Sequence, residues 1–399
     1  HQGSGRVGGD GVMAKLGEVC TIVSGSTPKT SVTSYWDGNI KWITPAELNE
    51  DTFYIMDSVR HITEEGKEKT GLSYLPAGTV ILSSRAPIGK TAIAGCEMCC
   101  NQGFKNLICS DAIYNEYLYF FLKSKTDYLN SLGRGATFKE ISKSIVESIE
   151  IPLPEVNQQK EIAEKFKKLE QLISLRKQQL AKLDELVKAR FVEMFGDPAD
   201  NVNNLPASPM TAICQIIDGD RGKNYPKQEE FSDSGFCLFL NAKNVTAQGF
   251  SFENCTYITE EKDALLRNGK LCRGDVVLTT RGTIGNLAFY DTSVPYENIR
   301  INSGMVILRM NKQVVSEIFF IEQFKMQLDS IKSRIASGSA QPQLPISTMN
   351  KIEMILPPIE LQNQFAAFVE RVSQQKQTVQ QSLEKLELMK KALMQEYFG

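Results

Sequence analysis

The segment IPLPEVNQQKEIAEKFKKLEQLISLRKQQLAKLDELVKARFVEMFG, residues 151–196, recurs 203 positions later as MILPPIELQNQFAAFVERVSQQKQTVQQSLEKLELMKKALMQEYFG, residues 354–399. The two copies align without a gap and have the same residue at 14 of 46 positions. A match of this length indicates an internal duplication, which determines the architecture before any single helix or strand is assigned.

Both copies have the pattern of a long helix. Each begins with two prolines, Pro152 and Pro154 in the first copy, and a helix can start just after a proline but cannot continue through it. Each copy ends at Phe-Gly, where Gly196 or Gly399 suits the left-handed conformation that closes a helix. We therefore predict two long helices.

Apolar residues between these ends recur at alternating spacings of four and three, which is the heptad seam of a coiled coil. The seam residues are Ile162, Phe166, Leu169, Ile173, Leu180, Leu183 and Val187 in the first copy and Phe365, Val369, Val372, Val379, Leu383, Leu386 and Leu393 in the second. Further seam positions carry Arg176, Arg190, Lys376 and Lys390, which either set the register or extend toward solvent. A helix of roughly 37 residues cannot bury its own apolar stripe. We expect the two helices to pack as an antiparallel coiled coil; the alternative is that each covers only its neighbouring domain.

The remaining sequence repeats more weakly. LPAGTVILSSRAPIG, residues 75–89, matches LCRGDVVLTTRGTIG, residues 271–285. Short β-rich runs with glycine between them predict strands, and a helical pattern closes each half. The expected fold class is α+β, with two homologous strand-rich domains separated by two long helices that form an antiparallel coiled coil with an internal pseudo-twofold. The expected segments are an expression scar (1–12), the first domain (13–150), the first spacer helix (151–200), the second domain (201–353) and the second spacer helix (354–399).

Composition excludes several classes of protein. Nine cysteines, an odd number, occur without a secretion signal, so free thiols in a reducing cytoplasm are expected. Only His1 and His61 are histidines, which argues against a histidine metal pair or a catalytic relay. No apolar run is long enough for a membrane helix. The net charge of -2 shows no basic surplus, although a basic face on a neutral chain remains compatible with DNA binding.

Motifs for chemistry are missing. Cys96, Cys99 and Cys100 with Cys109 resemble half of a zinc site, but buried thiols are the simpler interpretation. The chain has no phosphate-binding P-loop, no dinucleotide fingerprint and no Asn/Asp-Pro-Pro-aromatic motif of amino-methyltransferases. We therefore predict no catalytic residue, no metal and no cofactor in this chain.

Polar loops carry side chains that suit DNA. SGSTPK, residues 24–29, offers hydroxyls, backbone donors and a cation, and its counterpart is DGDRGKNY, residues 218–225. Arg85 and Arg281 stand at matching places just after a predicted strand. The candidate DNA-binding residues are Ser26, Thr27, Lys29, Lys41, Arg85, Lys90, Arg134, Lys139, Arg221, Lys223, Asn224, Lys243, Arg281, Arg334 and Gln341. The alternative for each of them is an ordinary turn or a surface salt bridge.

Together these motifs resemble a known family. The Pro-x-x-x-x-Gln start and Phe-Gly end of each helix, the SGSTPK loop, the stretch from Tyr35 to Trp42 and the repeated 75–89 segment are similar to the specificity subunit of type I restriction-modification enzymes. The resemblance covers Leu16 to Gly399. The second domain departs from the pattern, because it has GDRGK at 219–223 and lacks the tryptophan pair.

The resemblance implies a non-catalytic, cytoplasmic subunit. In that family, each of two target-recognition domains reads one half of a bipartite site on double-stranded DNA. The antiparallel coiled coil sets the spacing and docks two methyltransferase subunits, which carry S-adenosylmethionine, and restriction subunits join them. The alternative function is a coiled-coil scaffold for protein interactions without DNA binding.

Overall fold

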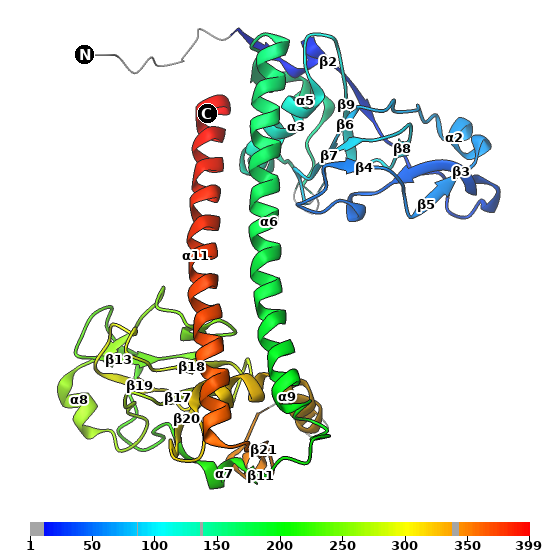
Figure 1. The fold of residues 1–399 in the computed structure, drawn as a ribbon. Coiled ribbons are helices and arrows are strands. Elements are labelled where there is room, and N and C mark those ends of the chain that lie inside the picture. Colours follow the sequence, from blue (N-terminus) through cyan, green and yellow to red (C-terminus); the bar gives the residue numbers. More distant parts are fainter. Residues whose placement is uncertain (1–11, 86, 136–138, 337–342) are drawn as a thin grey trace, which may run out of the picture. The chain divides into compact units, whose positions relative to one another are not determined.

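The protein is represented by a computed structural model that describes residues 12–85, 87–135, 139–336 and 343–399. The chain divides into two compact units (Figure 1). Unit 1 combines the residues up to Lys177 with Gln381–Gly399, and unit 2 comprises Gln178–Gln380. The two longest helices, α6 (Val156–Phe195) and α11 (Ile359–Phe398), each contribute to both units.

Unit 1 contains two β-sheets and a two-stranded ribbon. Its main sheet has the order β2-β9-β6-β7-β4, its second sheet has the order β5-β3-β8, and β1 pairs with β10. The strands are β1 (Met13–Lys15), β2 (Cys20–Ser24), β3 (Trp36–Ile43), β4 (Tyr54–Ile55), β5 (Arg60–Ile62), β6 (Val80–Ser83), β7 (Thr91–Ala94), β8 (Cys99–Cys100), β9 (Phe104–Cys109) and β10 (Glu150–Pro152). The helices before α6 are α1 (Leu16–Val19), α2 (Glu64–Thr70), α3 (Asn115–Ser124), α4 (Thr126–Leu132) and α5 (Lys143–Ser148).

Unit 2 repeats most of this arrangement, without a described strand that matches β4. Its main sheet has the order β12-β20-β17-β18 and its second sheet the order β16-β13-β19, while β11 pairs with β21 and β14 with β15. The strands are β11 (Ala207–Pro209), β12 (Cys214–Asp218), β13 (Cys237–Leu240), β14 (Val245–Thr246), β15 (Gly249–Phe250), β16 (Tyr257–Ile258), β17 (Val276–Thr279), β18 (Leu287–Phe289), β19 (Ile299–Ile301), β20 (Met305–Met310) and β21 (Glu353–Ile355). The helices before α11 are α7 (Met210–Ile213), α8 (Glu260–Leu265), α9 (Glu317–Ala336) and α10 (Ile346–Met349).

The strand directions recur as well as the strand order. The antiparallel pairs β2–β9 and β6–β9 correspond to β12–β20 and β17–β20. The second sheets share an unusual feature, because β3–β8 and β13–β19 are parallel pairs. The duplication therefore extends over both globular domains, and the predicted α+β fold class is confirmed.

The long helices pack against each other in opposite directions. In unit 1, Lys390 of α11 donates to Glu170 of α6 at 2.7 Å. Lys165, earlier in α6, donates to Tyr397, later in α11, at 3.0 Å. An earlier residue of α6 thus contacts a later residue of α11, so the two helices are antiparallel, as in the predicted coiled coil.

The predicted seam faces the helix contact. All 14 apolar seam side chains are buried or half-buried, whereas most positions between them are exposed. In unit 1 the Arg176 guanidinium donates to the Ser382 hydroxyl at 3.2 Å, and in unit 2 Lys376 pairs with Asp184 at 2.5 Å. Basic residues that interrupt the seam therefore join the two helices and can fix their register.

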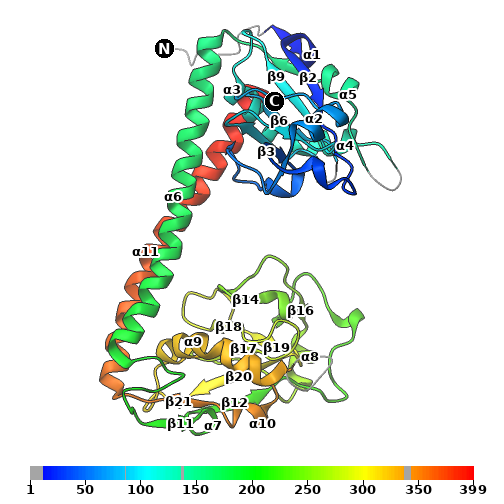
Figure 2. The same cartoon turned by 90° about the vertical axis from the view of Figure 1, so that its right-hand side faces the viewer.

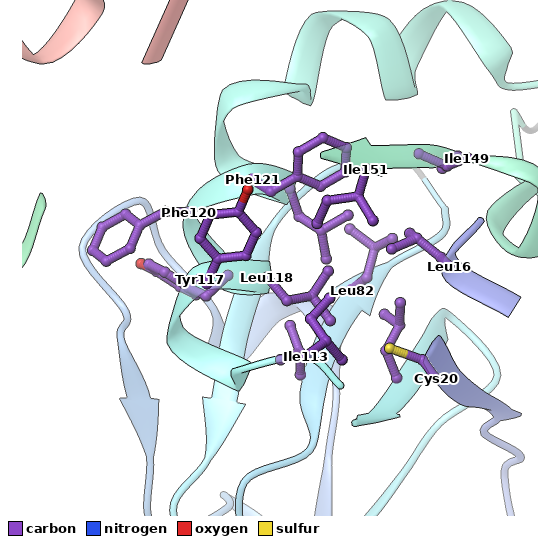
Figure 3. Packing of buried hydrophobic residues seen from close by; sticks show 14 of the residues in the cluster. Leu16, Cys20, Leu82, Ile113, Tyr117, Leu118, Phe120, Phe121, Ile149 and Ile151 are labelled. Atoms are coloured by element: carbon purple, nitrogen blue, oxygen red, sulfur yellow. The ribbon is translucent and has the colours of Figure 1, made fainter. Parts of the chain in front are cut away.

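The ends of the helix pair belong to the domain cores. Figure 3 shows Leu118 of α3 close to Leu82 of β6 and Phe121 of α3 close to Ile151 of β10, in the core of unit 1. Phe166 of α6 and Phe398 of α11 join the same cluster and stack with ring centroids 5.6 Å apart. Each such side chain contributes about 1.5–3 kcal/mol when buried, so the helix pair and the globular domain of unit 1 share one core.

Unit 2 has the equivalent junction. The Phe195 ring lies 5.0 Å from that of Phe319 and 5.7 Å from that of Phe365, measured between centroids. Phe319 belongs to α9, which lies beside the main sheet of this unit in Figure 2. Gly196 ends α6 with a φ of +80°, the left-handed conformation expected for the Phe-Gly end.

The predicted helical segments are longer than the helices. Residues 151–200 and 354–399 both begin with residues of a strand, since β10 ends at Pro152 and β21 ends at Ile355. The helices start only after the prolines that follow, at Val156 and Ile359. Proline rings exclude the preceding turn from the helix, which explains the difference.

Each long helix begins with a buried glutamine. The Gln159 carbonyl accepts from the Tyr114 backbone N–H at 2.7 Å, and its amide donates to the carbonyls of Ala112 and Pro154 at 3.0 and 2.8 Å. Gln362 makes the equivalent bonds to Ser316 N–H, Val314 O and Pro357 O at 3.0, 3.1 and 2.8 Å. This repeated clamp ties the start of each long helix to the loop before α3 or α9.

We predict that Gln159→Leu lowers the free energy of unfolding of unit 1 by about 1–3 kcal/mol, because it removes the partner of the Tyr114 N–H and of the Ala112 and Pro154 carbonyls at a buried side chain. Urea denaturation measures this loss. Gln158→Leu is the matched control, since Gln158 is exposed one position earlier and its replacement should change stability by no more than about 0.5 kcal/mol. Equal effects of the two variants would contradict the clamp.

Candidate nucleic-acid interface

Three loops meet at one end of the main sheet of unit 1. Residues 24–29 begin at the last residue of β2, residues 84–90 follow β6, and residues 101–103 precede β9. The antiparallel register brings these ends together, since Ser24 lies opposite Lys105. We call the described residues of these three loops loop cluster 1.

Close backbone contacts hold loop cluster 1 together. Ser26 N–H donates to the Cys100 carbonyl at 3.0 Å, and Ser84 N–H donates to the Gly103 carbonyl at 2.7 Å. A Cβ atom on Gly25 would lie 1.9 Å from the Asn101 carbonyl oxygen, so only glycine fits there. The loops therefore form a fixed surface.

Unit 2 has an equivalent loop cluster 2, formed by residues 218–225, 280–285 and 302–304. Thr280 N–H donates to the Gly304 carbonyl at 2.9 Å, as Ser84 does to Gly103 in unit 1. A Cβ atom on Gly219 would lie 2.2 Å from the Asn302 carbonyl oxygen. The same backbone framework is present twice.

Two tryptophans position the first loop of cluster 1. The Trp42 indole donates to the Ser26 carbonyl at 3.0 Å and the Trp36 indole donates to the Lys29 carbonyl at 3.2 Å. The two rings meet edge to face with centroids 5.2 Å apart. The Arg60 guanidinium lies 3.5 Å from the centre of the Trp36 ring. The indoles thus hold the SGSTPK loop by its backbone carbonyls, while the Lys29 side chain is exposed.

Loop cluster 2 uses a carboxylate in place of the tryptophans. Asp220 accepts from the backbone N–H groups of Gly222 and Arg267, each at 2.7 Å. Burial opposes its ionisation, but these hydrogen bonds and one from the Asn268 backbone prevail and hold the pKa of Asp220 below its usual value. The loop stays fixed although the tryptophan pair is missing.

Arg85 of cluster 1 is part of an ion network. Its guanidinium pairs with Glu140 at 3.0 Å, and the buried Lys105 pairs with the other Glu140 oxygen at 3.1 Å. Burial raises the pKa of Glu140, but the hydrogen bonds from Lys105 and Arg85 outweigh it and lower that pKa overall. The Arg85 guanidinium is therefore held by a carboxylate that it shares with Lys105, and the three groups together keep one net positive charge.

Arg281 occupies the matching place in cluster 2 with a different partner. Its backbone bridges to Gln343, whereas that of Arg85 bridges to Glu140. Gln343 thus replaces the acid, and within the described part of unit 2 no carboxylate pairs with the exposed Arg281. The two arginines are equivalent in backbone position but not in available charge.

The other candidates differ in exposure. Lys29, Arg134, Lys139, Lys223 and Lys243 are exposed, and Ser26, Thr27 and Asn224 are half-buried. Thr27 donates its hydroxyl to the Gln102 side chain, and Asn224 donates to the Leu265 carbonyl at 3.2 Å. Arg221 pairs with Asp218 at 3.1 Å. Gln341 and the side chain of Arg334 lie outside the described residues.

Two predicted lysines hold loops of their own domain. Lys41 is next to Trp42 in β3, and neighbouring residues in a strand point to opposite faces, so Lys41 faces away from the SGSTPK loop and donates to the Met56 carbonyl at 2.8 Å. Lys90 donates to the carbonyls of Pro45 and Leu48 at 3.3 and 2.8 Å. Their ammonium groups are engaged within the domain in this structure, and their contacts with DNA stay a prediction.

The cysteines of the zinc-like pattern separate in space. Cys99 packs with the Trp36 cluster, whereas Cys100 packs in a different cluster with Phe104, since consecutive strand residues face opposite sides. Among the residues that the structure describes, no group of three or more metal-ligating side chains comes together. A membrane-spanning helix is likewise not found in the described parts of the chain.

Sequence reasoning missed one repeated feature of the clusters. Asn101 and Asn302 each accept the backbone N–H of the glycine two positions later, at 2.8 and 2.9 Å. The signal was the motif Asn-x-Gly, but it follows Gly89 by 12 positions in the first domain and Gly285 by 17 in the second. The unequal spacing hides the match from a gap-free comparison.

Comparison with known proteins places this fold and these loops in a family. The profile for the type I restriction modification DNA specificity domain matches residues 10–185 and 210–388. The chain therefore belongs to this family. It is a DNA sequence-specificity subunit of a type I restriction-modification system, with one target-recognition domain in each unit.

Relatives match over most of the chain. The type I restriction enzyme MjaIX specificity subunit of Methanocaldococcus jannaschii is 29% identical, covering 92% of this chain and 87% of its own length. The MjaVIII specificity subunit of the same organism is 23% identical over 98% of this chain and 92% of its own. The EcoR124I/EcoR124II specificity subunit of Escherichia coli is 27% identical over 39% of this chain and 40% of its own.

Solved structures share the fold. The S subunit of a type I restriction-modification system from M. genitalium aligns over 98% of both chains, with a TM-score of 0.57 and 17% identity. A chain from a study of complex assembly and conformational transition of the type I R-M system aligns over 98% of both chains, with a TM-score of 0.61 and 16% identity. These likenesses support the two-domain, two-helix architecture.

Proposed function

We propose that each target-recognition domain reads one half of a bipartite, asymmetric site on double-stranded DNA. The observation that carries this proposal is the pair of equivalent loop clusters. They share backbone contacts such as the bond from Ser84 to Gly103, which recurs between Thr280 and Gly304, but they expose different side chains, as with Lys29 in cluster 1 and Lys223 in cluster 2. A shared framework with different polar groups is expected to select two different half-sites.

We further propose that the long helices set the gap between half-sites and dock two methyltransferase subunits, which restriction subunits then join. In support, apolar side chains outside the seam are exposed on both helices. Within unit 1 these include Leu175, which is 50% exposed, and Leu388, which is 67% exposed. A duplicated helix offers two similar surfaces, which suits two copies of one partner.

In this proposal the methyltransferase subunits catalyse the methylation. The sequence has no amino-methyltransferase motif, so S-adenosylmethionine is expected on the methyltransferase subunits and this chain is expected to be non-catalytic and without a metal. The complex would act in the cytoplasm, where its DNA target lies.

The test is sequencing of methylated positions in a host that carries this chain with its methyltransferase subunits. One bipartite motif with two different halves and a constant gap is expected. In gel shifts, the purified chain alone should bind DNA weakly, because a net charge of -2 limits counterion release, and specific binding should require the methyltransferase subunits. A continuous motif, or methylation without sequence preference, would contradict the proposal.

A further inference from the structure

A tight turn stands at the same place in both loop clusters. In unit 1 it is Asn101-Gln-Gly103, directly before β9, and in unit 2 it is Asn302-Ser-Gly304, directly before β20. In both turns the asparagine side chain accepts the backbone N–H of the glycine. The turn thus closes on itself through its first and third residues, and its middle residue takes no part in that bond.

The surrounding backbone fixes both turns in the same way. Asn101 N–H donates to the Ile43 carbonyl at the end of β3 at 3.0 Å, and Asn302 N–H donates to the Leu240 carbonyl at the end of β13 at 3.1 Å. On the other side, each turn approaches Gly25 or Gly219 so closely that neither glycine has room for a Cβ atom. The position of the turn in each domain therefore depends on backbone atoms and is independent of the middle side chain.

The middle residue lies among the candidate DNA-binding groups. Gln102 is exposed and accepts the hydroxyl of Thr27. Ser303 is half-buried, and its backbone carbonyl accepts from the Arg221 guanidinium at 3.2 Å. Arg281 N–H donates to the carbonyl of the next residue, Gly304, at 3.2 Å. Both turns thus present a variable polar side chain beside groups suited to DNA.

We propose that the middle residue of this turn determines sequence specificity, with Gln102 reading a base in one half-site and Ser303 a base in the other. The inference rests on the proposed DNA-reading function. The Gln102 amide has a donor and an acceptor side by side, which matches the N7 and N6 edge of adenine in the major groove. The Ser303 hydroxyl is shorter and pairs with several base edges, so the two domains discriminate differently at this position.

The test exchanges the two residues in the complete chain, expressed with its methyltransferase subunits. Gln102→Ser should reduce discrimination at one base pair of the first half-site by about tenfold or more and leave the second half-site unchanged. Ser303→Gln should change one base preference in the second half-site only. Sequencing of methylated DNA reads both halves at once.

Gln313→Ser is the matched control. Gln313 is exposed and also lies in a turn closed by an asparagine, since its N–H donates to Asn311 at 3.2 Å, but this turn follows the other end of β20. Both half-sites should be unchanged in this variant.

Two outcomes separate the inference from the function on which it rests. If the unaltered chain directs methylation to a bipartite site and Gln102→Ser keeps every base preference of the first half-site, the inference is overturned while the function stands. If the unaltered complex methylates no bipartite site, the proposed function itself fails. Thermal melting of each variant ensures that a changed preference is not the consequence of an unfolded domain.

Discussion

Deleting one heptad from each long helix should move methylation to new sites whose half-sites lie about three base pairs closer together. Seven residues of helix span about 10 Å, and three base pairs rise by about the same distance. Residues 180–186 and 374–380 form a matched pair for deletion, because they contain both partners of the Asp184–Lys376 ion pair. The remaining seam keeps its spacing of four and three.

The double variant Asp184→Ala with Lys376→Ala is the control for this deletion. It removes the same ion pair but keeps the helix length, so methylation should stay at the natural sites. Deleting the heptad from α6 alone should instead destabilise the protein, since the antiparallel partners then lose register. Sequencing of methylated DNA measures the gap between the two half-sites. An unchanged gap after the double deletion would show that the length of the helices does not set it.

The duplicated sequence was sufficient to predict the architecture. Heptad spacing depends only on the order of residues within one helix, so residues such as Phe166 and Leu383 could be assigned to the seam without knowing any tertiary contact. The same holds for Gly196, whose place after the last helical residue predicts its left-handed conformation. Local patterns of this kind can be recognised in the sequence because each lies within a single helix.

The sequence did not show which groups the charged side chains pair with. Lys41, Lys90 and Arg85 were all predicted to contact DNA, but the structure pairs them with loop carbonyls or with Glu140, which lies 55 positions after Arg85. Such pairs depend on which loops meet at the end of a sheet. Whether a charged side chain of a loop is free to contact DNA therefore depends on its tertiary neighbours, and these neighbours cannot be identified from a single sequence.

The loss of the tryptophan pair in the second domain illustrates the same limit. The sequence shows that Trp36 and Trp42 have no equivalents there, so the second domain departs from the pattern of the family. In the structure, Asp220 holds that loop by accepting two backbone N–H groups. Different side chains perform the same positioning role, so similarity of sequence underestimates similarity of structure.

Arg281→Ala should weaken specific DNA binding of the complex with its methyltransferase subunits by about 1–3 kcal/mol, and Arg85→Ala should weaken it much less. The two residues follow equivalent strands, so their distance from DNA should be similar. Glu140, which also pairs with Lys105, already holds the Arg85 guanidinium at 3.0 Å, whereas the matching position beside Arg281 is the neutral Gln343. The loss of binding on substitution by alanine should therefore be larger for the arginine whose guanidinium no described carboxylate holds.

A second variant keeps Arg281 and changes its neighbour Gln343. Gln343→Glu should give Arg281 the carboxylate that Arg85 has, and so reproduce most of the loss caused by Arg281→Ala without removing the guanidinium. Gel shifts at several salt concentrations measure both effects, and a lost phosphate contact should reduce the salt slope by about one. If Arg281 contacts a base, the preference changes in the second half-site alone; if it contacts a phosphate, affinity falls for all sequences alike. If Arg281→Ala instead lowers the melting temperature and leaves DNA binding unchanged, Arg281 is a framework residue. The difference between Glu140 and Gln343 would then not affect how the two domains bind their half-sites.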